Sequence, residues 1–462
     1  MKIYGLLLPV VFALVGPAAA AAAAPKPSNV LFIAIDDFRP KLGSYGDNEI
    51  ISPNIDRLAG SALIFSRAYC QVPICGASRA SLMTGILPTR DRFINHISQA
   101  EKDVPGAMTL PEVFKNAGYT TLSNGKIFHI KTDTQNRSWS EPAWRPSTKP
   151  SGDSTTQGEP AAKSARGLIF DSKDLPDNAY ADGQIAERTI EQLRGFKQSG
   201  KPFFIASGFF KPHMPFYAPK RYWDLYDRDK ISIANNRDRP IGAPKELNGS
   251  NEFRSYGFGE YEENSDDFHR MMRHGYLACV SYVDKLTGDI LGELEKLGLA
   301  ENTIVVIWGD HGFHLGEHSF WGKHNTMHVS IRVPLIIKVP GKGAGTTSSL
   351  VETSDIFPTL CKLAGLAAPE TVQGRDFSAL FDDPRMPFRE FAYSRYLAAD
   401  AVISNRFNFT SYNDGKTRML YDLENDPQEN VNLADDPSFS ATVGEMEEFI
   451  KQRKQEAARF QK

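Results

Sequence analysis

Three short segments of the sequence carry side chains that can bind a cation. Asp36 and Asp37 follow directly on one apolar run, Asp310 and His311 follow on another, and Cys75 lies in a loop between them. Neighbouring residues of a strand point to opposite faces, so two adjacent aspartates share an ion only where the strand has ended. Taken singly, these residues are more simply interpreted as helix caps or solvated loop acids. Taken together, they indicate a site for a hard cation such as Ca²⁺.

The elements that must position these residues alternate between strand and helix. The continuous apolar runs at 29–35 and 303–308 predict strands buried on both faces, and such strands present functional residues beyond their carboxyl ends. Further strands are predicted at 119–128, 203–207 and 333–339, and helices at 53–59, within 103–118, at 179–197, at 268–297 and from the capping residue Ser354 or Asp355 to about 363. This alternation predicts an α/β fold.

Two irregular segments and a change of pattern divide the chain. Residues 132–167 and 228–263 have no apolar period and predict long surface insertions. From about Phe388, short alternating stretches separated by Asn, Asp and Gly predict an antiparallel sheet, followed by a last helix at about 439–460. We therefore expect a large α/β domain at 25–384 and a small α+β subdomain at 385–462.

The first 24 residues have the pattern of a secretory signal peptide. Lys2 precedes an apolar run at 3–15, and a tract of small residues follows at 18–24. The apolar run is shorter than the roughly 20 residues that a membrane span needs. We expect cleavage near Pro25 and a secreted or periplasmic protein without a membrane anchor.

Composition excludes several classes of protein. The 462 residues include 53 Lys and Arg against 56 Asp and Glu, a net charge of −3 that gives no general electrostatic reason to bind nucleic acid. A hydrophobic content of 41% is that of a globular protein and excludes disorder or coiled coil for the whole chain. The four cysteines are too few for a disulfide framework, although one disulfide is compatible with them.

The segment around Cys75 carries a known signature. Cys75-Gly76-Ala77-Ser78-Arg79, continued by Ala-Ser-Leu-Met-Thr-Gly, matches the pattern Cys-x-(Pro/Ala)-x-Arg of the sulfatases. A lone cysteine is more often a small buried hydrophobe, but the extended match makes this signature specific. Further segments match in register: DDFRPKLGSYGD, SPNIDRLA, GYTTLSNGKIFH, GFFKPHMPF, GDHGFHLGEH and FPTLCKLAGL. The chain thus resembles the type I formylglycine-dependent sulfatase family, most closely its branch of iduronate-2-sulfatase and related polysaccharide sulfatases.

The resemblance implies an alkaline-phosphatase-like fold, with a large, mostly parallel mixed sheet flanked by helices, and a set of site residues. The signature cysteine of the family is oxidised to formylglycine by a maturation enzyme, which places that group at residue 75. A Ca²⁺ site is implied at Asp36, Asp37, Asp310 and His311, with an oxygen of residue 75, and oxygen donors suit Ca²⁺ or Mg²⁺ better than Zn²⁺. The other roles implied are orientation of the nucleophile by Arg79, proton removal with Lys126 and His129, and binding of the sulfate and leaving oxygens by His213 and Lys323.

The chemistry of sulfate esters agrees with this assignment. A sulfate monoester is an anion, and an ordinary serine or cysteine attacking it would be left as a stable sulfated enzyme. Hydrated formylglycine has two hydroxyls on one carbon, so that one attacks sulfur and the other expels the sulfate afterwards. We expect residue 75 to lie at an exposed turn.

Alternative interpretations concern the metal and the reaction. His311, His314 and His318 have a spacing that could bind zinc, but glycines 312 and 316 argue against the helix that would align them. A phosphomonoesterase or phosphodiesterase of the same superfamily would normally use Ser or Thr with two zinc ions. A generic arylsulfatase and a catalytically silent carbohydrate-binding protein are the remaining alternatives to hydrolysis of a sulfated oligosaccharide or polysaccharide.

Four further basic residues are candidates for a subsite that binds a substrate carboxylate or a second sulfate. They are His96, Arg145, Arg221 and Arg395. Solvated surface positions are the simpler interpretation of each.

Overall fold

The computed structural model describes residue 1 and residues 28–146 and 166–460 of the chain. Residues 2–24 of the predicted signal peptide and part of the first predicted insertion lie outside these described residues. Among the described residues, no helix combines the length and the apolar character that crossing a membrane requires.

A seven-stranded mixed sheet forms the centre of the molecule, as predicted. Its strand order is β13-β2-β12-β8-β1-β6-β4, and the four strands β8, β1, β6 and β4 are parallel, whereas β12 runs antiparallel to β8 and β2. The bounds are β1 Asn29–Asp36, β2 Leu63–Phe65, β4 Thr120–Gly125, β6 Phe203–Pro212, β8 Thr303–Gly309, β12 Leu335–Lys338 and β13 Gly345–Thr347. The carboxyl ends of β1, β6 and β8 therefore meet at one edge of the sheet.

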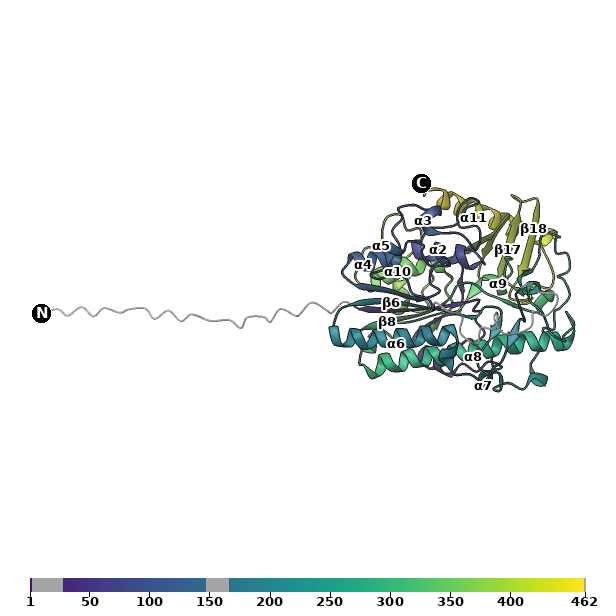
Figure 1. Cartoon of the computed structure of the whole chain (residues 1–462). Coiled ribbons are helices and arrows are strands. Elements are labelled where there is room, and N and C mark those ends of the chain that lie inside the picture. Colours follow the sequence, from purple (N-terminus) through teal and green to yellow (C-terminus); the bar gives the residue numbers. More distant parts are fainter. Residues whose placement is uncertain (2–27, 147–165, 461–462) are drawn as a thin grey trace.

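Helices cover both faces of this sheet (Figure 1). Helices α1 Pro53–Ala59, α6 Ala181–Ser199 and α8 Asp266–Lys296 pack on one face, and α2 Cys75–Thr84, α4 Leu110–Asn116 and α10 Ile356–Leu363 pack on the other. Alternate residues of β1 explain why both faces are apolar: Leu31 and Ile33 belong to one core, and Val30 and Phe32 to the other.

Shorter elements complete the large domain. The helices are α3 Ala100–Asp103, α5 Gln135–Ser138, α7 Lys220–Trp223 and α9 His328–Ile331, and the strands are β3 Ala68–Tyr69, β5 Phe170–Asp171, β7 Phe216–Tyr217, β9 His314–Leu315, β10 Trp321–Gly322, β11 Arg332–Val333 and β14 Val351–Glu352. The second predicted insertion contains two 3₁₀ turns, at Arg228–Lys230 and Glu252–Ser255.

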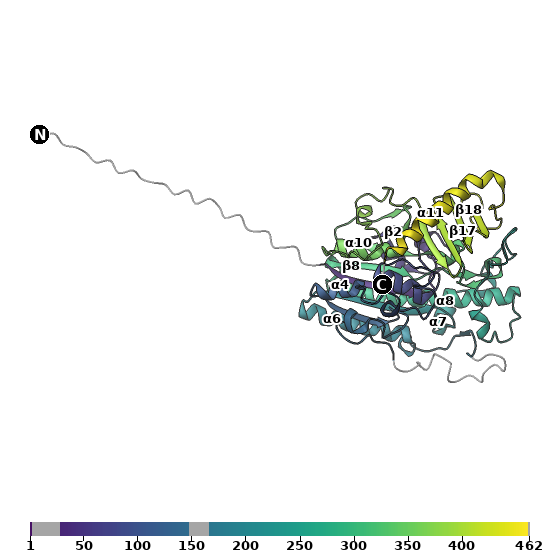
Figure 2. The ribbon, with the colours of Figure 1, turned by 90° about the horizontal axis from the view of Figure 1, so that it is seen from above.

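The C-terminal part is the predicted antiparallel sheet with a last helix. Strands β15 Ala392–Tyr396, β16 Ala399–Ile403, β17 Phe407–Tyr412 and β18 Thr417–Asp422 pair in sequence order, and α11 spans Ser440–Ala458. Figure 2 shows β17, β18 and α11 grouped on one side of the molecule. The domain boundary after residue 384 stays a prediction.

Two local features differ from the sequence-based expectation. Strand β6 continues to Pro212 instead of ending at Ser207, because its pairing with β1 continues past a register shift between Ile35 and Asp36. Helix α10 begins where predicted, but Asp355 does not cap it, since its carboxylate accepts from the Arg389 guanidinium and from backbone N–H groups. All four cysteines are free and buried, so the chain has no internal disulfide.

Candidate active site

The candidate site lies where β1 and β8 end side by side. Asp36 is the last residue of β1, and Asp37 follows it with a positive φ of 57°. Asp310 follows β8, and its Oδ1 accepts a hydrogen bond of 3.0 Å from the backbone N–H of Asp37. The parallel pairing of the two strands therefore brings these three carboxylates together, as the sequence predicts.

Cys75 is the first residue of helix α2 and faces this cluster. Its Sγ lies 3.2 Å from Nε2 of His311 and 3.9 Å from Oδ1 of Asp37. The expectation of an exposed turn is wrong, because Cys75 is only 3% exposed. The His96 backbone approaches the start of α2 so closely that a Cβ at Gly76 would lie 2.1 Å from the His96 carbonyl oxygen.

The donor set fits a cation. Ligand atoms of Asp36, Cys75, Asp310 and His311 all lie within 4.8 Å of one another and are buried. Nδ1 of His311 is 2.9 Å from the Gly312 carbonyl, which can only accept, so Nδ1 carries the proton and Nε2 offers its lone pair to the cluster. Two carboxylates and one imidazole with an oxygen at residue 75 are a donor set that a divalent cation binds.

The alternative histidine set does not converge. Nε2 of His314 contacts the side chain of Asn325, and Nε2 of His318 contacts the carbonyl of Gln428, 110 residues further along the chain. Within the described part of the chain, His314 and His318 are therefore engaged elsewhere and do not join His311 in a zinc site.

Arg79 holds the cluster from helix α2. Its guanidinium is fully buried and donates to Oδ2 of Asp310 at 2.9 Å and to Oδ1 of Asp36 at 3.1 Å. It also donates to the carbonyl of Ile127, in the turn that carries Lys126. Arg79 thus ties together two strands, one helix and the turn after β4.

Two lysines neutralise the aspartates further. Lys126 pairs with Asp36, and Nζ of Lys323 lies 2.9 Å from each carboxylate oxygen of Asp37. Burial on its own raises the pKa of Asp36, but the charges of Lys126 and Arg79 outweigh it and hold that pKa well below the usual range. Burial raises the pKa of Asp310, despite the nearby cations.

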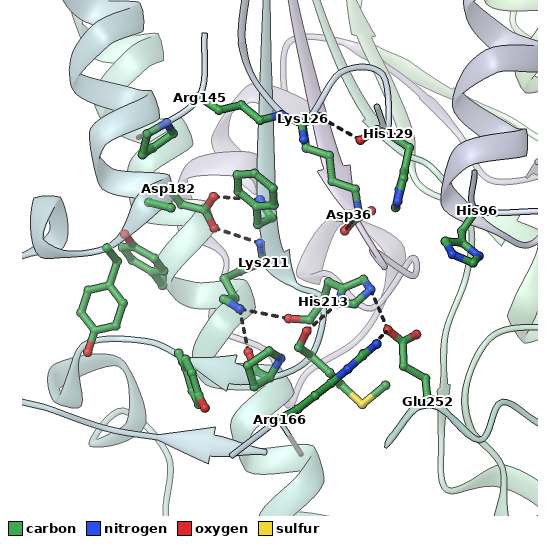
Figure 3. Close-up of a pocket in the computed structure, with 18 residues that line it drawn as sticks. Asp36, His96, Lys126, His129, Arg145, Arg166, Asp182, Lys211, His213 and Glu252 are labelled. Atoms are coloured by element: carbon green, nitrogen blue, oxygen red, sulfur yellow. Dashed lines mark hydrogen bonds and ion pairs between the residues drawn. The ribbon is translucent and has the colours of Figure 1, made fainter. Parts of the chain in front are cut away.

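His129 and His213 border a cavity of about 530 Å³ that opens from this cluster (Figure 3). Burial, reinforced by Lys126, lowers the pKa of His129 to about 3, and its Nδ1 has no hydrogen-bond partner among the described residues. Nε2 of His213 lies 3.9 Å from Oδ2 of Asp37. The ten residues to which the family resemblance assigns a metal-binding or catalytic role lie at the cluster or on the cavity wall.

The four additional basic residues divide into two pairs. His96 and Arg145 line the cavity, and Arg145 donates to the carbonyls of Gly125 and His129. Arg221 instead pairs with Asp177, and Arg395 is buried against Asp400. Within the described residues, Arg221 and Arg395 do not line this cavity.

Sequence reasoning missed Glu252. This residue opens the 3₁₀ turn in the second insertion, and its carboxylate lies 3.2 Å from Nζ of Lys323 and 3.4 Å from Nε2 of His213. Burial raises its pKa, but the charges of Lys323 and His213 hold the pKa well below the usual range. A single glutamate in a segment without periodicity carries no sequence signal for such a position.

Comparison with known families gives two matches to this chain. The model described as sulfatase matches residues 28–366, and the model described as the C-terminal part of N-sulphoglucosamine sulphohydrolase matches residues 316–456.

Among curated proteins, the human iduronate 2-sulfatase is 35% identical over 382 residues, which cover 74% of this chain and 70% of that protein. A sulfatase from Formosa agariphila is 31% identical over 443 residues, covering 90% of this chain and 84% of the relative.

Solved structures show the same fold. A protein in complex with its substrate D-glucosamine-2-N,6-O-disulfate superposes with a TM-score of 0.76 at 22% identity, covering 94% of this chain and 99% of that one. The phosphonate monoester hydrolase of Agrobacterium radiobacter superposes with a TM-score of 0.77 at 22% identity, covering 93% and 96%. The fold alone therefore does not separate sulfate from phosphonate chemistry.

Proposed function

The chain belongs to the sulfatase family of sulfuric ester hydrolases, and we propose that it removes sulfate from a sulfated oligosaccharide or polysaccharide. One observation carries this proposal: Cys75, in the sulfatase signature, faces a buried cluster of carboxylates at the end of a cavity lined by cationic side chains. The 35% sequence identity to human iduronate 2-sulfatase, whose name denotes a sulfated sugar as substrate, supports a carbohydrate substrate.

We propose that Asp36, Asp37, Asp310 and His311 bind Ca²⁺ together with an oxygen of residue 75, with Mg²⁺ and Zn²⁺ as less suitable ions. Ligand atoms of Asp36, Asp310 and His311 converge with residue 75 in one group, and those of Asp36 and Asp37 converge with residue 75 and His213 in a second. The bound cation would supply positive charge that makes a hydroxyl group on residue 75 more acidic. Arg79 keeps Asp36 and Asp310 in place through its two hydrogen bonds, so that the ligand set stays together.

Residue 75 supplies the nucleophile in this proposal, after a maturation enzyme has oxidised Cys75 to formylglycine. Its place at the start of α2 points the side chain at the cluster. Lys126 lies beside Asp36, and we assign His129, which borders the cavity and whose Nδ1 has no hydrogen-bond partner among the described residues, to proton removal from the hydroxyl group.

His213 and Lys323 approach the same locus from β6 and from the turn after β10. Both carry nitrogen donors, and we assign them to the sulfate oxygens and to the oxygen of the leaving alcohol. The N-terminal signal pattern supports a secreted or periplasmic location, where polysaccharide fragments would be the substrates.

The test is a comparison of kcat/KM for 4-nitrophenyl sulfate, 4-nitrophenyl phosphate and a panel of defined sulfated oligosaccharides. We expect a sulfated oligosaccharide to be the best substrate, because groups outside the sulfate site add binding energy in the transition state. A wide preference for the aryl sulfate identifies a generic arylsulfatase instead, and a preference for the phosphate ester contradicts the sulfatase assignment.

Two further measurements test the modification and the metal. Peptide mass analysis should find formylglycine at residue 75 in active enzyme. Exhaustive chelation should lower both activity and thermal stability, with Ca²⁺ restoring them, because a ligand of the folded state stabilises it. Full activity after complete chelation would contradict the metal assignment.

A further inference from the structure

Glu252 adds a carboxylate to a cavity whose wall also carries Asp36 and Asp182 beside the basic residues Lys126, Arg145, Arg166 and Lys211. It comes from the second insertion, and its side chain is 21% exposed on the cavity wall. Figure 3 shows the imidazole of His213 directed at the Glu252 carboxylate. A carboxylate here repels a sulfate ester and weakens its binding. We therefore ask which interaction of Glu252 favours the reaction enough to offset this repulsion.

The contacts of Lys323 indicate what that contribution is. Its ammonium group has three donor protons. Nζ lies 2.9 Å from both oxygens of Asp37 and 3.2 Å from Oε2 of Glu252. One proton shared between the two Asp37 oxygens and one directed at Glu252 leave the third for the ester. Without Glu252, Asp37 would be the remaining carboxylate partner of the ammonium group in the part of the chain that the structure describes, and Asp37 is itself a proposed ligand of the cation.

His213 is held in a similar way. Nδ1 of its ring donates to the carbonyl of Met214 at 2.5 Å, whereas Nε2 lies 3.4 Å from Oε1 of Glu252 and 3.9 Å from Oδ2 of Asp37, so Nε2 is a donor when the ring carries both protons. The shorter contact of Nε2 is thus with Glu252. Glu252 therefore contacts both donors that we assign to the sulfate and leaving oxygens, as Asp37 does from among the proposed cation ligands.

We propose that Glu252 is a positioning residue that holds Lys323 and His213 against the leaving oxygen of the ester. This inference rests on the proposed function, because it concerns the departure of the alcohol. The donors matter most when the alcohol is a poor leaving group such as a sugar hydroxyl, and little when it is 4-nitrophenol, which departs as a stable anion.

The experiment compares wild type with Glu252→Gln, which keeps the shape of the side chain and removes its charge. The substrates are 4-nitrophenyl sulfate and the best sulfated oligosaccharide of the panel. We expect kcat/KM for the oligosaccharide to fall about 100-fold, mainly through kcat, and kcat/KM for the aryl ester to fall less than about fivefold. Glu260→Gln, an exposed residue of the same insertion, is the matched control and should leave both values unchanged.

The outcomes are distinguishable. Equal losses of kcat/KM on both esters would overturn the positioning role. A lower KM with an unchanged kcat in Glu252→Gln would also overturn it, because Glu252 would then only repel the substrate anion. A wild type inactive on both esters contradicts the proposed function itself. A second variant, Glu252→Asp, retains the charge on a shorter side chain and should recover part of the oligosaccharide activity, which a purely structural defect would not do.

Discussion

At the scale of single residues, the site depends on groups that are buried and paired. Arg79 lies one helical turn after Cys75, so α2 delivers both the reacting residue and the cation that holds Asp36 and Asp310. Removing one partner of a buried ion pair lowers the stability of the fold by far more than the intact pair contributes to it, because a buried charge is left without a partner. The spacing of four residues in the signature therefore has a structural reason as well as a chemical one.

Cys75→Ala should abolish sulfate release and leave the fold intact. The substitution removes the thiol group that the maturation enzyme requires to convert Cβ into the aldehyde of formylglycine, so no nucleophile forms, and the smaller alanine fits a position that is 3% exposed. Sulfate release and thermal unfolding of wild type and variant are the measurements. Activity within tenfold of wild type would refute the nucleophilic role of residue 75.

At the scale of elements, the start of α2 depends on a close contact with a neighbouring loop. A Cβ on Gly76 would lie 2.1 Å from the backbone oxygen of His96, whereas Gly195, inside α6, has open space around it. Gly76→Ala should therefore destabilise the protein by roughly 1–3 kcal/mol and displace the residue before it. Gly195→Ala should be neutral or stabilise α6 slightly. The measurements are the free energy of unfolding in urea and the rate of sulfate release of both variants. Wild-type values of both quantities in Gly76→Ala would show that the His96 loop moves to accommodate a Cβ without cost.

Contacts between elements also determine how much of the molecule the sequence predicts. Strands β1 and β8 are predictable because continuous apolar runs end in Asp36 and Asp310, and parallel neighbours end at one edge. The burial of Cys75 is not predictable, because it depends on how the loop of His96 packs over α2. Glu252 is not predictable either, since an insertion without periodicity reveals nothing about which of its side chains turns inward.

A buried glutamate between α9 and β17 predicts how stability varies with pH. Glu429 accepts hydrogen bonds from the backbone N–H of His328 and from the side chain of Asn408, and burial raises its pKa to about 7. The folded protein thus binds the proton of the Glu429 carboxyl group more tightly than the unfolded chain, in which this group has the ordinary pKa of 4.5. The resulting contribution to stability is full below pH 4.5 and is lost as the pH rises to about 7, by roughly 3 kcal/mol.

Glu429→Gln mimics the protonated acid and should flatten this dependence between pH 5 and pH 8. The measurement is the free energy of unfolding in urea at several pH values. Glu445→Gln, an exposed glutamate of α11, is the control and should retain the slope of the wild type. An equal slope in Glu429→Gln and wild type would show that Glu429 does not titrate in this range.

At the scale of the whole molecule, buried ion pairs join the C-terminal sheet and helix to the large domain. Arg453 of α11 donates to Glu352 of β14 at 2.5 Å, and both side chains are at most 1% exposed. Glu352 also accepts from the backbone N–H of Tyr393 at the start of β15. Apolar residues of the C-terminal part, such as Ile403, belong to the core under the central sheet. The two predicted domains thus share one interior, and we expect them to unfold together.

Arg453→Met tests this coupling, because it leaves Glu352 buried without its closest cation. We expect a loss of about 3–5 kcal/mol, partly recovered in the double variant Arg453→Met with Glu352→Gln. All five tryptophans precede residue 384, so their fluorescence reports on the large domain alone, whereas far-ultraviolet circular dichroism reports on the whole chain. The two signals should change at the same urea concentration in wild type and in the variant, because neither part retains a complete core without the other. Two separate transitions in the wild type would instead show that the C-terminal part is an independent folding unit.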